Sequence, residues 1–427
     1  MVTFDSPYQG YLYSYPHKTA YGQLPLISLA EAWRNERRDA LFLYAHVPFC
    51  EMRCGFCNLF TLARPPAALA ARWLDRMDLE VDAALEALGS ASFARFAIGG
   101  GTPTWLEVNQ LERLLDGMSR LGADLAHIPG SVEVSPGTVT PEKIALLVER
   151  GATRISMGVQ SLVEAETCAV YRPQDSAVVA AAVQIIRQYR PPVLNLDLIY
   201  GLPGQTVASW RESLSRLIEW EPEEIYCYPL YVRSQTGFGR HGGAAEDAHR
   251  LRLYRVGREV LLEAGYTQSS MRQFQRSSGP AGPTYRCQED GMVGLGVGAR
   301  SYTSRLHWSS QFAVEARGIR AIVEGWILSD PRRVSWGFPM DDAEERRRWV
   351  ILSILSDLGV SRQGYEARYG DLMADFPQLS RLVDGQLATW YEGNLRLTPA
   401  GLEQSDAIGP WLISESVRRR MDAATVR

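Results

Sequence analysis

The sequence has very little lysine and no long apolar run. Lys18 and Lys143 are the only lysines, which leaves 43 arginines among the 45 basic residues. The formal net charge of −4 argues against a nucleic-acid partner. There is no charged-then-apolar leader, and no apolar run approaches the ~18 residues that a membrane span needs. We therefore expect a cytoplasmic protein with neither a nucleic-acid nor a membrane partner.

Cysteine is also scarce, with six residues in a chain of 427. Three of the six lie within eight positions, so the set does not form a disulfide framework, and reduced thiols fit a reducing compartment. Cys168 and Cys227 lie in helix-like and strand-like contexts, where we expect both in the core.

The three clustered thiols are Cys50, Cys54 and Cys57, and they directly follow the apolar run 41–47. That run predicts a buried strand, so one loop at a strand end offers all three side chains. Three thiolates do not complete a tetrahedral zinc site, whereas a [4Fe-4S] cluster held by three cysteines keeps one iron open for a substrate. The alternatives are a zinc site with a distant fourth ligand and a fortuitous trio.

Apolar strands alternate with amphipathic helices after this loop. This order predicts a parallel sheet with right-handed crossovers, and six units suggest an open, partial (β/α)6 barrel of TIM-like type. Ligands are expected at the carboxyl ends of its strands. The predicted strands are 41–47, 95–99, 131–135, 154–160, 193–200 and 224–232, and the predicted helices are 74–88, 107–121, 141–150, 176–189, 208–220 and 247–264.

We expect four regions along the chain: an aromatic segment at 1–40, the barrel at 41–265, an extension at 266–339, and a small helical, winged-helix-like domain with a short hairpin at 340–427. Five tyrosines and His17 occupy positions 8–21. This segment could fold over the barrel mouth and stack on a flat substrate, or it could only pack. A glycine-rich stretch at 291–299 permits tight turns or close backbone approach.

Polar residues recur at the ends of the predicted strands. Gly99 to Thr102 follow the second strand, Glu133 and Gln160 end the third and fourth, and Asp197 lies in the fifth. Buried without partners, such groups would each cost ~1–3 kcal/mol, so a ligand or Arg172 must satisfy them. The alternatives are a tight turn at the glycines and an internal polar network without a ligand.

Together these segments resemble the HemN-like branch (oxygen-independent coproporphyrinogen III oxidases and relatives) of the radical S-adenosylmethionine (SAM) enzymes. The most specific strings are Ser-Met-Gly-Val-Gln at 156–160 and Asp-Leu-Ile-Tyr-Gly-Leu-Pro at 197–203. The resemblance covers about 44–302. It implies a [4Fe-4S] cluster on Cys50, Cys54 and Cys57, a reductant of flavodoxin or ferredoxin type, and SAM, with a second SAM molecule near Gly101, Gln160 and Ile199. The implied SAM contacts are Phe56, Gly100, Gly101, Thr102, Glu133, Gln160, Arg172, Asp197 and Ile199.

Two departures from this branch narrow the expected activity. Porphyrinogen-oxidising members carry a further cysteine where this chain has Leu59, and haem chaperones carry a haem-binding motif where it has Tyr-Arg-Cys-Gln-Glu-Asp at 285–290. The resemblance is therefore nearest to class C radical methyltransferases and cyclopropanases, which use two SAM molecules to alkylate an sp² carbon of a small natural product. The alternatives are porphyrinogen oxidation and haem delivery without turnover. Cys287 could serve the substrate chemistry or be a buried hydrophobe.

Overall fold

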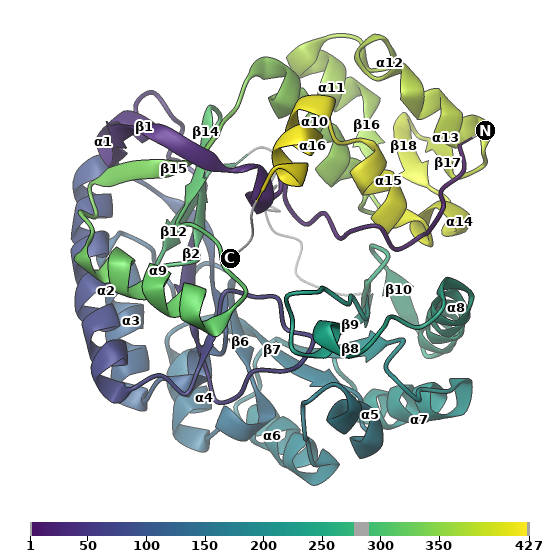
Figure 1. Ribbon diagram of the computed structural model, residues 1–427, viewed down its shortest axis with the longest axis horizontal. Helices are drawn as coiled ribbons and strands as arrows, with labels where there is room; N and C mark the ends of the chain where they lie inside the picture. Colours follow the sequence, from purple (N-terminus) through teal and green to yellow (C-terminus); the bar gives the residue numbers. More distant parts are fainter. Residues whose placement is uncertain (1, 277–289, 425–427) are drawn as a thin grey trace.

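A curved parallel sheet with helices on its outer face forms the first half of the molecule (Figure 1). The computed structural model describes residues 2–276 and 290–424. Six neighbouring parallel strands confirm the predicted partial barrel. They are β2 (Leu41–Val47), β5 (Phe93–Gly100), β6 (Gly130–Val134), β7 (Ala152–Gln160), β8 (Val193–Tyr200) and β9 (Glu224–Pro229).

The helices follow the strands in the predicted order. Each lays its apolar stripe on the sheet, as in α2, where Trp73, Met77 and Val81 are buried. Leu85, which shares the predicted stripe, is 42% exposed and lies off that face. The outer helices are α2 (Ala67–Leu88), α3 (Val108–Arg120), α4 (Pro141–Glu149), α5 (Glu164–Ala169), α6 (Ser176–Gln188), α7 (Val207–Ile218) and α8 (Asp247–Glu263).

The sheet continues beyond the six barrel strands at both edges, which gives 13 strands. β12 (Met292–Leu295) runs parallel to β2, and β13 (Arg300–Tyr302), β14 (Leu306–Ser309), β15 (Arg333–Pro339) and β1 (Gly22–Ser28) follow antiparallel. At the other edge lie β11 (Gln273–Arg276) and β10 (Tyr266–Gln268). The short helix α1 (Leu29–Ala32) and the longer helix α9 (Ala316–Leu328) complete this half.

The glycine-rich stretch 291–299 therefore forms β12 and a tight turn. Gly296 and Gly298 have φ angles of 88° and 95°, and a Cβ on Gly296 would lie 2.7 Å from the His46 carbonyl oxygen. The glycines let this turn approach the carboxyl end of β2.

The last quarter of the chain has its own core around a three-stranded sheet, β16 (Val360–Ser361), β18 (Asn394–Leu397) and β17 (Ala388–Tyr391). This agrees with the helical domain and hairpin expected there. Tyr15 and Tyr21 of the N-terminal segment are buried in the same core. Its helices are α10 (Asp342–Ile354), α11 (Arg362–Tyr369), α12 (Leu372–Asp375), α13 (Ser380–Asp384), α14 (Pro399–Leu402), α15 (Ser405–Trp411) and α16 (Glu415–Asp422).

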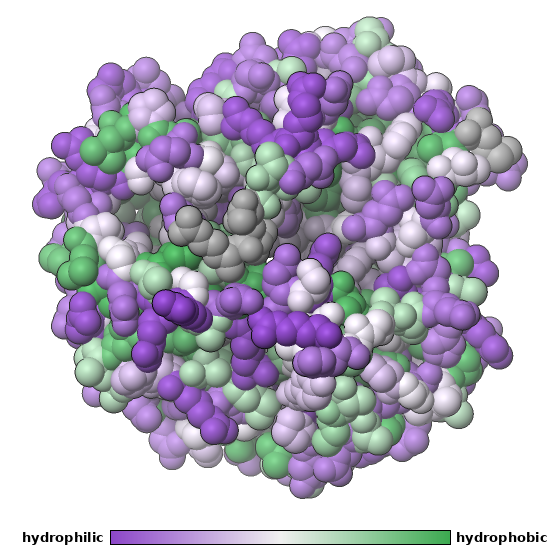
Figure 2. Space-filling view, in the orientation of Figure 1, coloured by the Kyte–Doolittle hydropathy of each residue, from purple (hydrophilic) through white to green (hydrophobic). Residues whose placement is uncertain are grey.

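Apolar side chains gather in the cores rather than on the surface. On the face drawn in Figure 2, hydrophobic residues are scattered among hydrophilic ones. Within residues 2–276 and 290–424, no helix combines the length and the apolar character that crossing a membrane requires.

Candidate active site

The loop that follows β2 holds the three clustered cysteines against the carboxyl ends of the neighbouring strands. β3 (Phe49–Cys50) pairs with β4 (Leu62–Ala63), which closes the loop. The amide of Gly101 donates to the Val47 carbonyl at 2.8 Å and that of Thr102 to the Phe49 carbonyl at 2.7 Å. Gly55 donates to Val170 at 2.8 Å. The cluster loop is thereby tied both to the end of β5 and to the chain after β7.

Polar groups contact two of the three sulfurs, while burial favours the neutral thiol in the absence of a metal. Thr61 and Thr102 each place a hydroxyl 3.2 Å from Cys50 Sγ, and an Arg172 nitrogen lies 3.2 Å from Cys54 Sγ. Burial raises the pKa of Cys50 and raises that of Cys57 to about 12. Because ligation requires thiolates, binding a metal cluster here releases protons.

The three sulfurs are offered from one loop, between Cys50 and Cys57. Three thiolates on one loop are a donor set that a [4Fe-4S] cluster takes, with each sulfur on a different iron and one iron left open. A structural zinc site typically has four protein ligands, and this loop supplies three cysteines.

The glycine turn after β5 packs closely against the cluster loop. Gly100 has a φ of 123°, and a Cβ on Gly101 would lie 2.4 Å from the Phe49 carbonyl oxygen and 2.9 Å from Cys50 Sγ. Only glycine fits at these two positions, so the backbone itself lies next to the cluster loop. The amino-acid end of SAM is predicted to bind at this turn.

Two carboxyl groups face each other across this end of the barrel. Glu133 accepts a hydrogen bond from the Gly100 amide at 3.0 Å, and Asp197 accepts one from Asn195 at 2.8 Å. Glu133 keeps accessible surface and Asp197 is half-buried, yet desolvation at this end of the barrel, opposed by these hydrogen bonds, raises the pKa of Glu133 to about 7 and that of Asp197 to about 6. Their mutual repulsion adds to the rise for Glu133. Such a pair is suited to accept hydrogen bonds from hydroxyl and ammonium groups.

Arg172 does not form the ion pair considered for it with these carboxylates. Its guanidinium instead donates to the Gly158 carbonyl at 2.7 Å and to Cys54 Sγ. It lowers the pKa of Asp197 only from a distance. The sequence indicated that a ligand or Arg172 must satisfy these carboxylates, but it did not indicate that Arg172 would contact the cluster loop instead.

The remaining predicted SAM contacts lie around the same strand ends. Gln160 ends β7 with a φ of 68°, opposite Leu198 on β8. Ile199 is buried in a small apolar cluster against which Phe56 packs. The structure thus brings the predicted residues to one end of the barrel, although it does not itself test their roles.

Several residues from the N-terminal segment and β13 reach this site. The sequence predicted a role here for the tyrosine segment, but it assigned none to Lys18 or Arg300. Tyr11 and Tyr13 are 36% and 42% exposed, yet burial raises the pKa of Tyr11, and Asp197 is near enough to contribute to that rise. Cys57 is close enough to Lys18 to influence the pKa of its ammonium group, and the Arg300 guanidinium lies 4.7 Å from the centroid of the Tyr13 ring. The accessible surface of Tyr11 and Tyr13 therefore faces the interior of the barrel. Lysine scarcity was a signal for Lys18, whereas nothing distinguished Arg300 among 43 arginines.

The other cysteines take no part in the described site. Cys227 is buried, as predicted, but Cys168 is exposed on α5, so the core prediction for Cys168 is wrong. Its helix is short, and that position faces away from the sheet. Cys287 and most of the 285–290 stretch lie outside the described residues. Leu59 is 46% exposed two positions after the last cluster cysteine.

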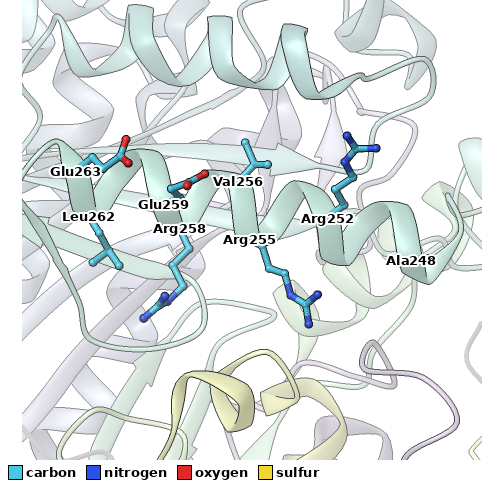
Figure 3. A pocket seen from close by; sticks show the side chains of 8 residues that line it. All are labelled: Ala248, Arg252, Arg255, Val256, Arg258, Glu259, Leu262 and Glu263. Carbon is cyan, nitrogen blue, oxygen red and sulfur yellow. The ribbon is translucent and has the colours of Figure 1, made fainter.

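One hollow lies beside the candidate site, and another lies away from it. A small one of about 160 Å³ beside the cluster loop is lined by Glu51, Ser135 and Arg172, among others. A larger groove of about 750 Å³ runs along α8, where Arg255, Arg258 and Leu262 project from the same side of the helix (Figure 3). Arg255 is paired with Glu403 at 2.7 Å. This groove contains none of the predicted site residues.

Comparison with known proteins supports the same chemistry. Residues 44–217 match the model of the Radical SAM superfamily. An oxygen-independent coproporphyrinogen III oxidase of Paracoccus denitrificans is 27% identical over 391 residues, which cover 85% of this chain and 84% of that protein. The haem chaperone HemW of Escherichia coli is 26% identical over 302 residues, 69% of this chain and 78% of that protein.

The solved structure of coproporphyrinogen III oxidase HemN from Escherichia coli has the same fold. It superposes with a TM-score of 0.79 at 23% identity and covers 93% of this chain and 96% of its own. The chain therefore carries a radical SAM domain in a HemN-like fold, and a [4Fe-4S] cluster and SAM are its cofactors.

Proposed function

We propose that this radical SAM enzyme removes a hydrogen atom from a planar, unsaturated small molecule and completes an oxidation. The observation that carries the proposal is a shared interior at this end of the barrel. It is bordered by the cysteine loop, by the carboxyls of Glu133 and Asp197, whose pKa values are raised, and by the accessible faces of Tyr11 and Tyr13. Asp197 influences the ionisation of Tyr11, and Tyr13 and Cys57 both influence that of Lys18. A cofactor at the strand ends and a substrate on the tyrosines would therefore be neighbours.

Each part of the chain has a distinct task in this proposal. When bound, the cluster and SAM supply a carbon-centred radical that takes one hydrogen atom. The turn at Gly100 and Gly101 keeps side chains away from the amino-acid end of SAM, and Glu133 and Asp197 accept its hydrogen bonds. The rings of Tyr11 and Tyr13, 5.3 Å apart, offer an aromatic face for a flat substrate. The N-terminal segment also keeps bulk water from this end of the barrel.

The relatives support oxidation as the outcome. The Paracoccus relative, matched over 84% of its length, is named an oxidase. Loss of a hydrogen atom leaves a substrate radical, and loss of one more electron to a one-electron acceptor, with release of carbon dioxide, completes an oxidative decarboxylation. Cleavage of SAM also needs one electron from a reductant, for which a flavodoxin- or ferredoxin-type protein is suited.

Methyl or methylene transfer to an sp² carbon is the second candidate. The observation in its favour is Leu59, because an exposed leucine replaces the further cysteine of porphyrinogen-oxidising enzymes. The polar and backbone groups near Gly101, Gln160 and Ile199 would then take a second SAM molecule. The products of this route are S-adenosylhomocysteine and a methylated or cyclopropanated compound.

Methyl-deuterated SAM separates the two candidates. Oxidation places substrate hydrogen, not deuterium, in 5′-deoxyadenosine and yields no S-adenosylhomocysteine. Alkylation places deuterium in 5′-deoxyadenosine and in the added carbon, with S-adenosylhomocysteine as co-product, and that result would replace oxidation with the second candidate. A reconstituted enzyme that forms no 5′-deoxyadenosine under reducing conditions would refute both.

A further inference from the structure

Two cations from distant parts of the chain come together beside the cluster loop. Lys18 opens the short helix at Lys18–Ala20, and its Nζ lies 3.4 Å from the centroid of the Phe312 ring. Arg300 begins β13, where its guanidinium donates to the Ser14 hydroxyl and lies 4.7 Å from the Tyr13 ring. Both side chains are half-buried.

Neither cation has a carboxylate partner. Among residues 2–276 and 290–424, no Asp or Glu oxygen lies within 4.0 Å of the Lys18 ammonium or the Arg300 guanidinium. Other deep arginines of the barrel are paired: Arg154 contacts Glu224 at 2.7 Å, and Arg272 contacts the buried Asp406. Uncompensated cations this deep are costly unless a ligand neutralises them.

The surrounding groups leave a local excess of positive charge. Burial, together with Arg300, lowers the pKa of Lys18 to about 8, against the opposing effects of Tyr13 and Cys57. Burial and the nearby cations lower the pKa of His17 to about 3, so its imidazole is neutral and adds no charge. Burial alone would raise the pKa of Tyr13, yet Arg300 and Lys18 hold it below its ordinary value.

We propose that Lys18 and Arg300 form a subsite that binds a carboxylate group beside the cluster. Arginine can hold both oxygens of a carboxylate at once, and lysine adds a point charge from a second direction. The carboxylate belongs either to the substrate or to a second molecule of SAM. This inference rests on the proposed function, because it takes the interior near Cys57 to be the reaction cavity.

The two lysines of the chain give a direct test. In reconstituted enzyme labelled with ¹³C-lysine, Lys18 and Lys143 give one side-chain signal each by nuclear magnetic resonance. Lys143 is the internal control, since its Nζ already donates to the Thr104 carbonyl at 2.7 Å. The probes are S-adenosylhomocysteine, 5′-methylthioadenosine, which lacks the amino-acid carboxylate, and succinate.

A carboxylate subsite shifts the Lys18 signal and leaves Lys143 unmoved. A shift with S-adenosylhomocysteine but not with 5′-methylthioadenosine supports a cofactor carboxylate there. A shift when succinate is added to enzyme already saturated with S-adenosylhomocysteine supports a substrate carboxylate. If neither carboxylate-bearing probe moves the Lys18 signal, the inference is overturned.

Substitutions give a second readout. Lys18→Met keeps the apolar stem over Phe312 but removes the charge. Binding of whichever probe shifts the Lys18 signal should therefore weaken roughly 10- to 100-fold. Arg300→Met should do the same, Arg300→Lys should restore part of the affinity, and Lys143→Met should change nothing. Equal probe affinity in Lys18→Met and the unmodified enzyme would refute the subsite. Enzyme that forms 5′-deoxyadenosine but shows no Lys18 response loses this inference alone, whereas failure to form it removes the proposed function.

Discussion

The barrel wall and the segment over its mouth are built in different ways. The wall places Cys50, the glycine turn, Glu133 and Asp197 at the ends of successive strands, each within its own short motif. The mouth is assembled from residues 8–21, β13 and the C-terminal domain, which are far apart in the sequence. The groups for cofactor chemistry thus depend on local structure, and the groups proposed to meet the substrate depend on long-range contacts.

Polar contacts add to the apolar packing that holds the mouth. The Tyr15 hydroxyl donates to Glu344 at 2.5 Å, and the buried Arg272 pairs with Asp406 of α15. Tyr231 donates to the same Asp406 carboxylate. These bonds join the C-terminal domain to the barrel and to the N-terminal segment. Substitutions in them should therefore alter substrate recognition and leave the cofactor chemistry of the barrel wall intact.

The largest effect should follow from loss of a cluster cysteine. Alanine at Cys50, Cys54 or Cys57 removes one of three thiolates that the loop supplies, so cluster assembly and 5′-deoxyadenosine formation should both be abolished. The unmodified chain should bind about four irons after anaerobic reconstitution. Cys168→Ala is the control, because that thiol is exposed outside the site. Continued SAM cleavage by the triple variant would contradict the assignment.

The next largest effect should fall on the contacts that hold the mouth. Asp406→Asn leaves the buried Arg272 without its charge partner, which should lower the free energy of unfolding by ~3–5 kcal/mol in urea denaturation. The double variant Arg272→Met with Asp406→Leu should lose less, because no charge stays uncompensated. A loss below about 1 kcal/mol for Asp406→Asn would show that this pair does not hold the domains together.

The sequence predicted the wall well because its signals are local. An apolar run followed by an amphipathic helix, repeated six times, places each strand within a few residues, and strands 41–47 and 193–200 agree with β2 and β8 at both ends. The motifs at the strand ends then lie together automatically, since parallel strands share their carboxyl edge.

The sequence could not predict the mouth because its contacts are non-local. Nothing near Arg272 or Asp406 indicates that the two meet across 134 positions, and the extension joins the rest of the sheet through distant pairings, β12 with β2 and β15 with β1. In the tyrosine segment, Tyr15 and Tyr21 pack into the C-terminal core, whereas Tyr11 and Tyr13 keep accessible surface, and their stacking on a substrate stays a prediction.

Within the wall, Asp197 and Arg172 should have separable effects. Asp197→Ala removes a hydrogen-bond acceptor worth ~1.5–3 kcal/mol, so SAM affinity should fall by one to two powers of ten with the cluster spectrum unchanged. Arg172→Ala should weaken SAM similarly but also perturb the spectrum, because its guanidinium touches Cys54 Sγ. Asp124→Ala, at an exposed surface site, is the control. Unchanged affinity in both variants would place the SAM pocket elsewhere.

The smallest effect should be a pH dependence of cofactor binding that is caused by the two carboxyl groups of the barrel wall. Glu133 and Asp197 have pKa values of about 7 and about 6, so raising the pH through this range ionises both carboxyls. Ionised carboxylates accept hydrogen bonds from ammonium and hydroxyl groups more strongly, so affinity for S-adenosylhomocysteine should rise by roughly tenfold between pH 5.5 and 8. Calorimetric titration at each pH measures this.

Stability without ligand should change in the opposite direction. The folded chain holds these protons more tightly than the unfolded chain, whose carboxyls titrate near 4.5 and 3.8, so the free energy of unfolding should fall as the pH rises from about 4 to about 7. Glu133→Gln should flatten both profiles, whereas Asp124→Ala, at an exposed surface site, should leave them unchanged. Profiles that stay the same in Glu133→Gln would mean that this carboxyl does not govern cofactor binding.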